Sequence, residues 1–215
     1  MIFIPKKIHF IWIGTDKCPF EDNIRTYIVQ NPKWEVKIWK DKDLFPLHNK
    51  YTYNKMNSWA GKADVIRLEI LYRFGGIYVD TDSRCVKPLD GLVDNLFAFG
   101  MQAHTGKINN CMLGCTINHP AFERLVYEMR SHVDKLAKTA KNKKKGIGLR
   151  DIAGSGFITP ILRADETYTQ LDKGKARGAR ELVGSEMDYL AVKNGYILQY
   201  PAQSWVNKKQ RRVVL

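Results

Sequence analysis

Residues 74–82, FGGIYVDTD, constrain the fold more than any other part of the chain. They follow a segment, 58–74, whose apolar residues recur at helical spacing, with Ser58 placed as its N-cap. The pair Gly75-Gly76 provides a C-terminal stop, and the apolar run Ile77–Val79 predicts a strand that begins at once. We therefore expect the helix to turn sharply and to pack against the strand that follows it.

Two aspartates, Asp80 and Asp82, end this predicted strand. Side chains alternate along an extended chain, so both carboxylates are expected to point the same way, with Cα atoms roughly 6.5 Å apart. Two carboxylates at that spacing can share one hard divalent cation. An enzyme that handles a nucleotide diphosphate needs such a cation, because the departing diphosphate carries charge that a metal balances.

Strands and helices are predicted to alternate along the chain, without an internal repeat, which indicates an α/β fold. A loop with short helices is predicted at 40–57, and an apolar segment interrupted by glycines and a proline occupies 151–162. The other predicted strands are 7–13, 34–39, 96–101 and 111–117, with short ones near 181–183 and 191–193, and the other predicted helices are 20–30 and 120–136.

The chain has 215 residues, which suits a single domain, and its 44% hydrophobic content favours a folded protein. It contains no apolar run of the roughly 18 residues that span a bilayer, and its first residues lack the order of a signal peptide, so we expect a cytoplasmic protein. The four cysteines form no CxxC pair, and we interpret them as buried thiols. A metal site of Cys111 and Cys115 with His104 or His119 is the alternative.

A net charge of +13 comes from 35 Lys and Arg against 22 Asp and Glu. Six lysines lie within 135–145, and four basic residues lie within 207–212. Such clusters suit contact with phosphates of nucleic acid or of an anionic membrane leaflet. A solvated helix end followed by a frayed tail is the other interpretation, and basicity alone does not decide between them.

Asp64 and Arg67 lie three residues apart in the predicted helix and therefore share one face. They could form a surface ion pair worth less than about 1 kcal/mol. Because the helix leads directly into the strand that carries Asp80, the pair could instead lie beside the predicted metal site, at the sheet edge where α/β proteins bind ligands.

Three motifs together resemble one family: Ile8–Gly14 (IHFIWIG), Ala63–Arg67 (ADVIR) and Gly75–Asp82 (GGIYVDTD). They are similar to the DxD-containing sugar transferases of glycosyltransferase family 32, which include yeast-type α-mannosyltransferases and bacterial capsule or lipopolysaccharide transferases. The glucosylating domains of the large clostridial toxins share much of the pattern. The resemblance is densest over residues 8–88 and thins toward residue 205. A lone DxD is a weak signal, but its combination with the other two motifs is specific.

The resemblance implies a GT-A fold, in which a Rossmann-like nucleotide-binding half with a mixed central sheet is fused to a small acceptor-binding half. Residues 1–100 would mainly bind the nucleotide sugar, and residues 101–215 would form the acceptor side and a C-terminal lid. The implied activity is metal-dependent, retaining transfer from a UDP- or GDP-sugar to a saccharide or lipid-linked saccharide, in cell-surface polysaccharide synthesis. We expect the basic clusters to dock such an enzyme on the inner face of an anionic membrane, and we expect no nucleic-acid partner.

The resemblance also assigns residues. Asp80 and Asp82 would hold Mn²⁺ or Mg²⁺ against the donor diphosphate, Asp82 as the more direct ligand and Asp80 toward the ribose or a metal-bound water. Trp12 would stack on the nucleobase, although a core position is its other interpretation. The catalytic group comprises Asp64 on the sugar hydroxyls, Arg67 on donor oxygens, Asp80, and Asn110 facing the transferred sugar. The implied donor site comprises Ile11, Trp12, Asp64, Arg67, Asp80, Thr81, Asp82, Ser204 and Trp205.

Near the C-terminus, Gln199-Tyr200 stands where members of the family often carry histidine. Ser204 is carried over as a contact to metal or phosphate, and Trp205 as a contact to the diphosphate. The identity of a third protein ligand to the metal stays open.

Other functions fit parts of the pattern. A phosphatase of the haloacid-dehalogenase type also places Asp-x-Asp after a strand, but its motif continues to Gly-Thr, whereas Ser83-Arg84 follows here. A nucleic-acid-binding module would explain the charge, yet the chain has none of the common signatures of such modules. A toxin-like enzyme that modifies a protein is a further alternative. No carboxylate is evident as a nucleophile, so we expect front-face substitution rather than a double displacement.

Overall fold

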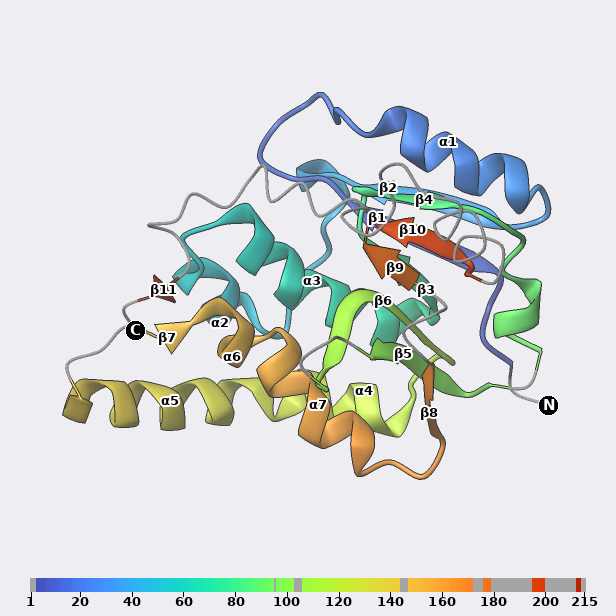
Figure 1. Ribbon diagram of the computed structural model, residues 1–215. Helices are drawn as coiled ribbons and strands as arrows, with labels where there is room; N and C mark the ends of the chain where they lie inside the picture. Colours follow the sequence, from blue (N-terminus) through green and yellow to red (C-terminus); the bar gives the residue numbers. More distant parts are fainter. Residues whose placement is uncertain are drawn as a thin grey trace.

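A six-stranded mixed sheet forms the centre of the protein (Figure 1). The computed structural model describes residues 3–94, 96–102, 106–143, 147–171, 176–178, 195–199 and 212–213. The strand order is β2-β1-β3-β6-β5-β8, in which β3–β6 and β5–β6 are antiparallel and the other pairs are parallel. The strands are β1 (Lys7–Ile11), β2 (Glu35–Trp39), β3 (Gly76–Val79), β5 (Ala98–Gln102), β6 (Ile108–Cys115) and β8 (Tyr168–Leu171).

Two small sheets and several helices surround this centre. One small sheet has the order β4-β10-β9, with β4 (Ser83–Cys85), β9 (Ala176–Gly178) and β10 (Ile197–Gln199), and the other pairs β7 (Ile147–Gly148) with β11 (Arg212–Val213). The α-helices are α1 (Glu21–Gln30), α2 (Lys50–Lys55), α3 (Trp59–Phe74), α4 (Pro120–Tyr127), α5 (Met129–Lys143), α6 (Leu149–Ile152) and α7 (Ser155–Arg163). The described residues also form two 3₁₀ turns, η1 (Asp41–Asp43) and η2 (Asp90–Leu92).

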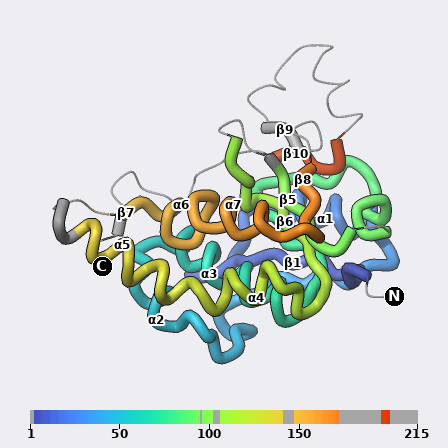
Figure 2. Tube along the Cα trace, turned by 90° about the horizontal axis from the view of Figure 1, so that it is seen from below, coloured from blue at the N-terminus to red at the C-terminus, as the bar shows by residue number. Residues whose placement is uncertain are grey.

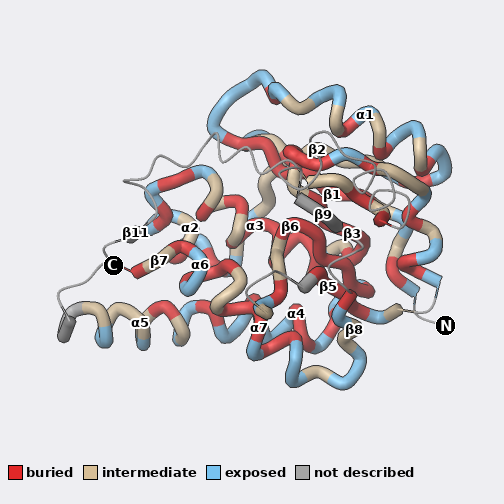
Figure 3. Tube along the Cα trace, in the orientation of Figure 1, coloured by how far each residue is buried: buried red, intermediate tan, exposed pale blue. Residues whose placement is uncertain are grey.

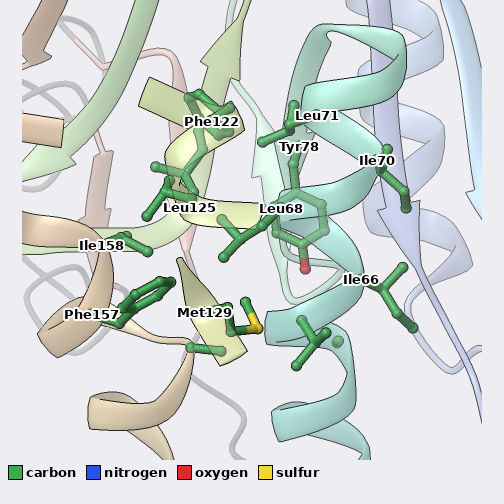
Figure 4. Close-up of a cluster of buried hydrophobic side chains, with 14 of the residues drawn as sticks. Ile66, Leu68, Ile70, Leu71, Tyr78, Phe122, Leu125, Met129, Phe157 and Ile158 are labelled. Atoms are coloured by element: carbon green, nitrogen blue, oxygen red, sulfur yellow. The ribbon is translucent and has the colours of Figure 1, made fainter. Parts of the chain in front are cut away.

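Helices cover both faces of the sheet, because its central strands alternate apolar side chains between two cores. Ile8 and Phe10 point into the core beneath α1, whereas Ile11 belongs to the larger core beneath α3 to α7. Figure 4 shows that larger core, where Leu68 of α3 faces Tyr78 of β3 and side chains of α4 and α7. In Figure 3 the central strands β1 and β3 are mostly buried, while the outer sides of α1 and α5 are exposed. Figure 2, seen from below, shows α4 and α5 along the outside of the helical layer.

The predicted helix, stop and strand at 58–79 are confirmed. Ser58 caps α3 by accepting a hydrogen bond from the Gly61 backbone N–H, 3.1 Å away. Gly75 and Gly76 both have positive φ, +60° and +90°, a conformation that glycine adopts without strain. A Cβ on Gly76 would also lie 2.7 Å from the backbone oxygen of Lys7, on the neighbouring strand. The Gly-Gly pair is therefore required both by the sharp turn and by the close approach of β1.

Some predicted elements differ from the structure. β3 ends at Val79, and residues 81 and 82 form a turn into β4, so the expectation that both aspartates extend the strand is wrong. The expected single helix over 120–136 is two helices that meet near Glu128, and the second continues to Lys143 through part of the lysine-rich segment. β6 begins at Ile108, three residues before the prediction. The short strands predicted near 181–183 and 191–193 lie outside the described residues.

The cysteines are free and buried, as expected. Within the described ranges, no group of three or more His, Cys, Asp or Glu side chains is arranged to hold a metal ion. His119 instead caps α4 and contacts the Thr167 hydroxyl, and His104 lies outside the described residues. Among the helices of the described part, none is long and apolar enough to cross a bilayer.

Candidate active site at the Asp80–Asp82 turn

The turn Asp80-Thr81-Asp82 lies where β3, β4, β6 and α3 meet, and its backbone is held on several sides. The Asp80 N–H donates to the Cys111 carbonyl of β6 at 2.9 Å. The Ser83 hydroxyl donates to the Asp80 carbonyl at 2.6 Å and lies 2.7 Å from the hydroxyl of the buried Tyr27 on α1. The sheet and α1 therefore fix the position of the two aspartates before any ligand binds.

Arg67 forms the centre of the site and is only 4% exposed. Its Nη1 donates to Asp80 Oδ1 at 3.2 Å and to the Asn110 carbonyl at 2.6 Å, and its Nη2 lies 2.8 Å from Asp64 Oδ1. Its Nε donates to the Ala63 carbonyl at 3.3 Å, and the guanidinium lies 4.3 Å from the centre of the Tyr78 ring. Four of the five guanidinium N–H groups are thus directed at protein acceptors within the described residues. The Asp64–Arg67 pair is a buried part of this site and not a surface ion pair.

Asp64 keeps one carboxylate oxygen available. Arg67 and the Asn110 side-chain amide both approach Oδ1, the amide at 2.7 Å. No hydrogen-bond partner of Asp64 Oδ2 occurs among the described residues, and the side chain is 15% exposed. The structure therefore brings Asp64, Arg67, Asp80 and Asn110 together, as predicted, with an acceptor oxygen left for a ligand.

Burial dominates the electrostatics of the carboxylates. It raises the pKa of Asp64 to about 6, against the opposing effect of Arg67. Burial also raises the pKa of Asp80, and Arg67 and the Tyr78 hydroxyl partly offset this shift. Burial by itself would lower the pKa of Arg67, but Tyr78, Asp64 and Asp80 raise it above the ordinary value. Arg67 consequently stays charged and compensates two buried carboxylates.

The side chains of the turn fit a hard divalent cation. Asp80, Thr81 and Asp82 offer only oxygen atoms, and the Asp82 side chain is buried at 7% exposure. The buried Thr81 hydroxyl has no hydrogen-bond partner within the described part of the chain. Mg²⁺ is commonly held by one or two carboxylates together with substrate phosphates and water. Asp80 and Asp82 can provide the two carboxylates.

The two donor-site residues predicted at the end of β1, Ile11 and Trp12, are buried in opposite cores. Trp12 is 8% exposed, its Nε1 donates to the Thr15 hydroxyl at 2.9 Å, and the ring meets Phe20 edge to face. Ile11 is the last residue of β1 and points into the opposite core. Stacking of Trp12 on a base stays a prediction. Ser204 and Trp205 lie outside the described residues.

Comparison with known proteins connects this site to a family. Residues 19–98 match the family described as a glycosyltransferase sugar-binding region containing a DXD motif. The match spans α1, α3, Arg67 and the Asp80–Asp82 turn. Over this segment the chain is similar to the DXD-containing glycosyltransferases. One relative by sequence is inositol phosphoceramide mannosyltransferase 2 of Schizosaccharomyces pombe, which is 26% identical over 95% of this chain. The chain spans 59% of that relative's length.

Solved structures confirm the GT-A fold of this chain. The PaToxG glycosyltransferase matches with a TM-score of 0.59 and 22% identity, over 76% of this chain and 70% of that one. The ligand-free glycosyltransferase domain of the YGT toxin matches with a TM-score of 0.61 and 10% identity, over 80% of this chain and 81% of that one. At these identities the likeness establishes the fold alone.

Two residues of the site carry roles that the sequence interpretation did not assign. The Tyr78 hydroxyl donates to Asp80 Oδ1 at 2.7 Å, and the Gln199 amide Nε2 lies 3.3 Å from Asp80 Oδ2. Tyr78 precedes Asp80 by two residues, so strand alternation could have placed both on one side. Gln199 is 119 residues from Asp80, and no local signal predicts that contact.

Proposed function

We propose that this protein is a metal-dependent, retaining glycosyltransferase that moves a hexose from a UDP- or GDP-sugar to a saccharide or lipid-linked saccharide. The observation that carries the proposal is the Arg67-centred cluster, in which Asp64, Asp80 and Asn110 are fixed beside the DXD turn. The Schizosaccharomyces pombe relative is named for mannose transfer to inositol phosphoceramide, which supports a hexose donor and an acceptor with a lipid anchor.

The chemistry of the site fits such a transfer. Departure of a nucleoside diphosphate puts negative charge on phosphate oxygens, and Mg²⁺ or Mn²⁺ held by Asp80 and Asp82 supplies Lewis acidity there. Two unit charges ~4 Å apart at an effective dielectric near 20 interact by about 4 kcal/mol, or some three decades of rate. Asp64 Oδ2 accepts a hydrogen bond from a hydroxyl of the donor sugar, and Asn110 orients Asp64 for this contact. Asp64 and Asp80 are both paired with Arg67, which lowers the nucleophilicity of each carboxylate and supports front-face substitution.

A screen of UDP- and GDP-sugars for Mn²⁺-dependent hydrolysis tests this function, with Asp82→Asn as the diagnostic variant. We expect one or more donors to be hydrolysed and Asp82→Asn to be slower by at least about 100-fold, because the amide loses the charge that holds the cation. Equal hydrolysis by Asp82→Asn would refute the metal assignment. Mass spectrometry of the same mixtures should find no covalent glycosyl-enzyme, and a trapped one would exclude front-face substitution.

We also propose that the basic face of α5 docks the enzyme on an anionic membrane, where a lipid-linked acceptor would lie. Lys135 and Lys138 are exposed on this helix, which runs along the outer side of the helical layer (Figure 2). A basic side chain near an anionic leaflet contributes about 1 kcal/mol to binding. Among the side chains of α4 and α5 that the structure describes, the exposed Arg124 and Arg130 are paired with Glu128 and Asp134.

Sedimentation with vesicles that contain phosphatidylserine, at physiological salt, tests this docking. The double variant Lys135→Glu/Lys138→Glu should bind at least about 10-fold more weakly than the parent protein. The variant Lys17→Glu/Lys33→Glu makes the same change in net charge at exposed positions elsewhere, and it should bind nearly as well as the parent. Equal losses in both variants would mean that net charge alone, and not α5, governs binding.

A further inference from the structure

Strand pairing brings Gln199 to the DXD turn. β10 runs antiparallel to β4, with Gln199 opposite Ser83, the residue that directly follows Asp82. The Gln199 side chain is half-buried, and its Nε2 lies 3.3 Å from Asp80 Oδ2. The third strand of this small sheet, β9, pairs with β10 on its other side and holds it in register.

The two oxygens of Asp80 are in different situations. Oδ1 accepts hydrogen bonds from the Tyr78 hydroxyl at 2.7 Å and from Arg67 Nη1 at 3.2 Å. The partner of Oδ2 among the described residues is the Gln199 amide. Oδ1 is therefore committed to the protein, and Oδ2 is the oxygen that this carboxylate can offer to a cation.

The separation between Oδ2 and the Gln199 amide suits two ligands of one cation. It is 3.3 Å, longer than the usual 2.9–3.0 Å of an N–H···O bond, so this hydrogen bond is weak. Neighbouring ligands of octahedral Mg²⁺, each at roughly 2.0–2.1 Å, lie about 3 Å apart. The oxygen and nitrogen of a primary amide are similar in size, so turning the amide over places Oε1 where Nε2 now lies. Two oxygens at that distance repel each other unless a cation lies between them.

We propose that Gln199 is a metal-binding side chain of this glycosyltransferase. Its amide donates to Asp80 Oδ2 in the metal-free protein and turns over to present Oε1 when Mg²⁺ or Mn²⁺ binds. The protein ligands are then oxygen atoms only, which favours hard cations over those that prefer imidazole. The inference rests on the proposed metal-dependent function. Gln199 would bind the metal at the position where members of the family often carry histidine.

Mn²⁺ binding to the untagged full chain without nucleotide, followed by electron paramagnetic resonance, tests this role independently of catalysis. Gln199→Leu should weaken Mn²⁺ binding by about 10-fold, because it removes one neutral oxygen ligand. Gln199→His should show a directly coordinated ¹⁴N nucleus in electron spin echo spectra. The parent protein and the matched control Gln30→His, which adds a histidine on α1, should show none.

The outcomes separate this inference from the proposed function. Unchanged Mn²⁺ affinity in Gln199→Leu, together with no nitrogen coupling in Gln199→His, would mean that Gln199 only braces Asp80, and the proposal would be overturned. If Asp82→Asn loses Mn²⁺ binding in the same experiment, the metal site at the DXD turn is supported and only the role of Gln199 is refuted. Absence of Mn²⁺ binding by the parent protein would overturn both the ligand role and the metal site.

Discussion

Arg67→Met is expected to slow sugar transfer by at least about 1,000-fold and to lower the free energy of unfolding by about 3–5 kcal/mol. The guanidinium is the positive charge among Asp64, Asp80 and the Asn110 carbonyl, and it is 4% exposed. Methionine keeps much of the side-chain volume but leaves two buried carboxylates without a cation. Removing one partner of a buried ion pair is costly because the remaining charge is desolvated and uncompensated.

The catalytic loss and the stability loss have the same origin. Without Arg67, Asp80 loses one of the donors that fix Oδ1, and Asp64 loses the group that sets its position next to Asn110. A displacement of about 1 Å in such groups can cost about 100-fold in rate, before any loss of positive charge near the leaving phosphate is counted. Both effects arise from the same contacts, so they should appear together.

Arg73→Met is the matched control for this prediction. Arg73 lies in the last turn of the same helix, is exposed, and stacks over Phe45 at 4.2 Å. Its replacement should change the free energy of unfolding by no more than about 1 kcal/mol and leave the transfer rate near that of the parent. Urea unfolding and donor hydrolysis measure the two quantities. Similar losses in the two variants would contradict the central role of Arg67.

The parts of the site that depend on local sequence could be predicted. Ser58, Gly75 and Gly76 fix the start and end of α3, so the faces of α3 and β3 follow from spacing. The pair Asp64 and Arg67 then lies toward Asp80 because helix and strand are joined without a loop. The resemblance of three motifs to a known family predicted a role for each of these site residues. The family match and the GT-A fold confirm that resemblance.

The rest depends on contacts between distant segments. The pairing of β10 with β4 sets the position of Gln199, and both strands have three residues, too short for a pattern to give register. The break near Glu128 lacks a proline or glycine, so helical periodicity runs through it. β3 ends at Val79 and the chain turns at Thr81 and Asp82, next to the hydrogen bonds of Ser83 with Tyr27 on α1 and with the Asp80 carbonyl. These are tertiary contacts between distant segments, and the secondary-structure propensities of individual residues do not predict them.

His9 is expected to make the protein lose stability as the pH falls from 6.5 to 4. The imidazole is 2% exposed on β1, between the Gly75 carbonyl at 2.8 Å from Nε2 and the Trp39 indole at 3.2 Å from Nδ1. The Trp39 N–H donates to Nδ1, so Nε2 carries the proton that is donated to Gly75. A second proton on Nδ1 would face another N–H, and burial adds to this cost by lowering the pKa of His9 to about 4.

The sign of the effect follows from the two end states. An unfolded histidine takes up a proton near pH 6.5, whereas His9 in the folded protein resists protonation until about pH 4. The stabilisation is therefore complete above pH 6.5 and is lost progressively as the pH falls toward 4. The difference between the two pKa values corresponds to about 3 kcal/mol.

Urea unfolding at pH 7 and pH 4 measures this contribution. The parent protein should lose about 3 kcal/mol more than His9→Gln between the two values, although His9→Gln is less stable at pH 7 because the ring contacts with Trp39 and Phe74 are lost. His48→Gln removes an exposed imidazole and should follow the parental pH curve. If His9→Gln shows the same pH dependence as the parent, a different buried group must sense acid. Because the second proton goes to Nδ1, protonation of His9 would first break the hydrogen bond from Trp39 on β2, while Nε2 would still donate to the Gly75 carbonyl.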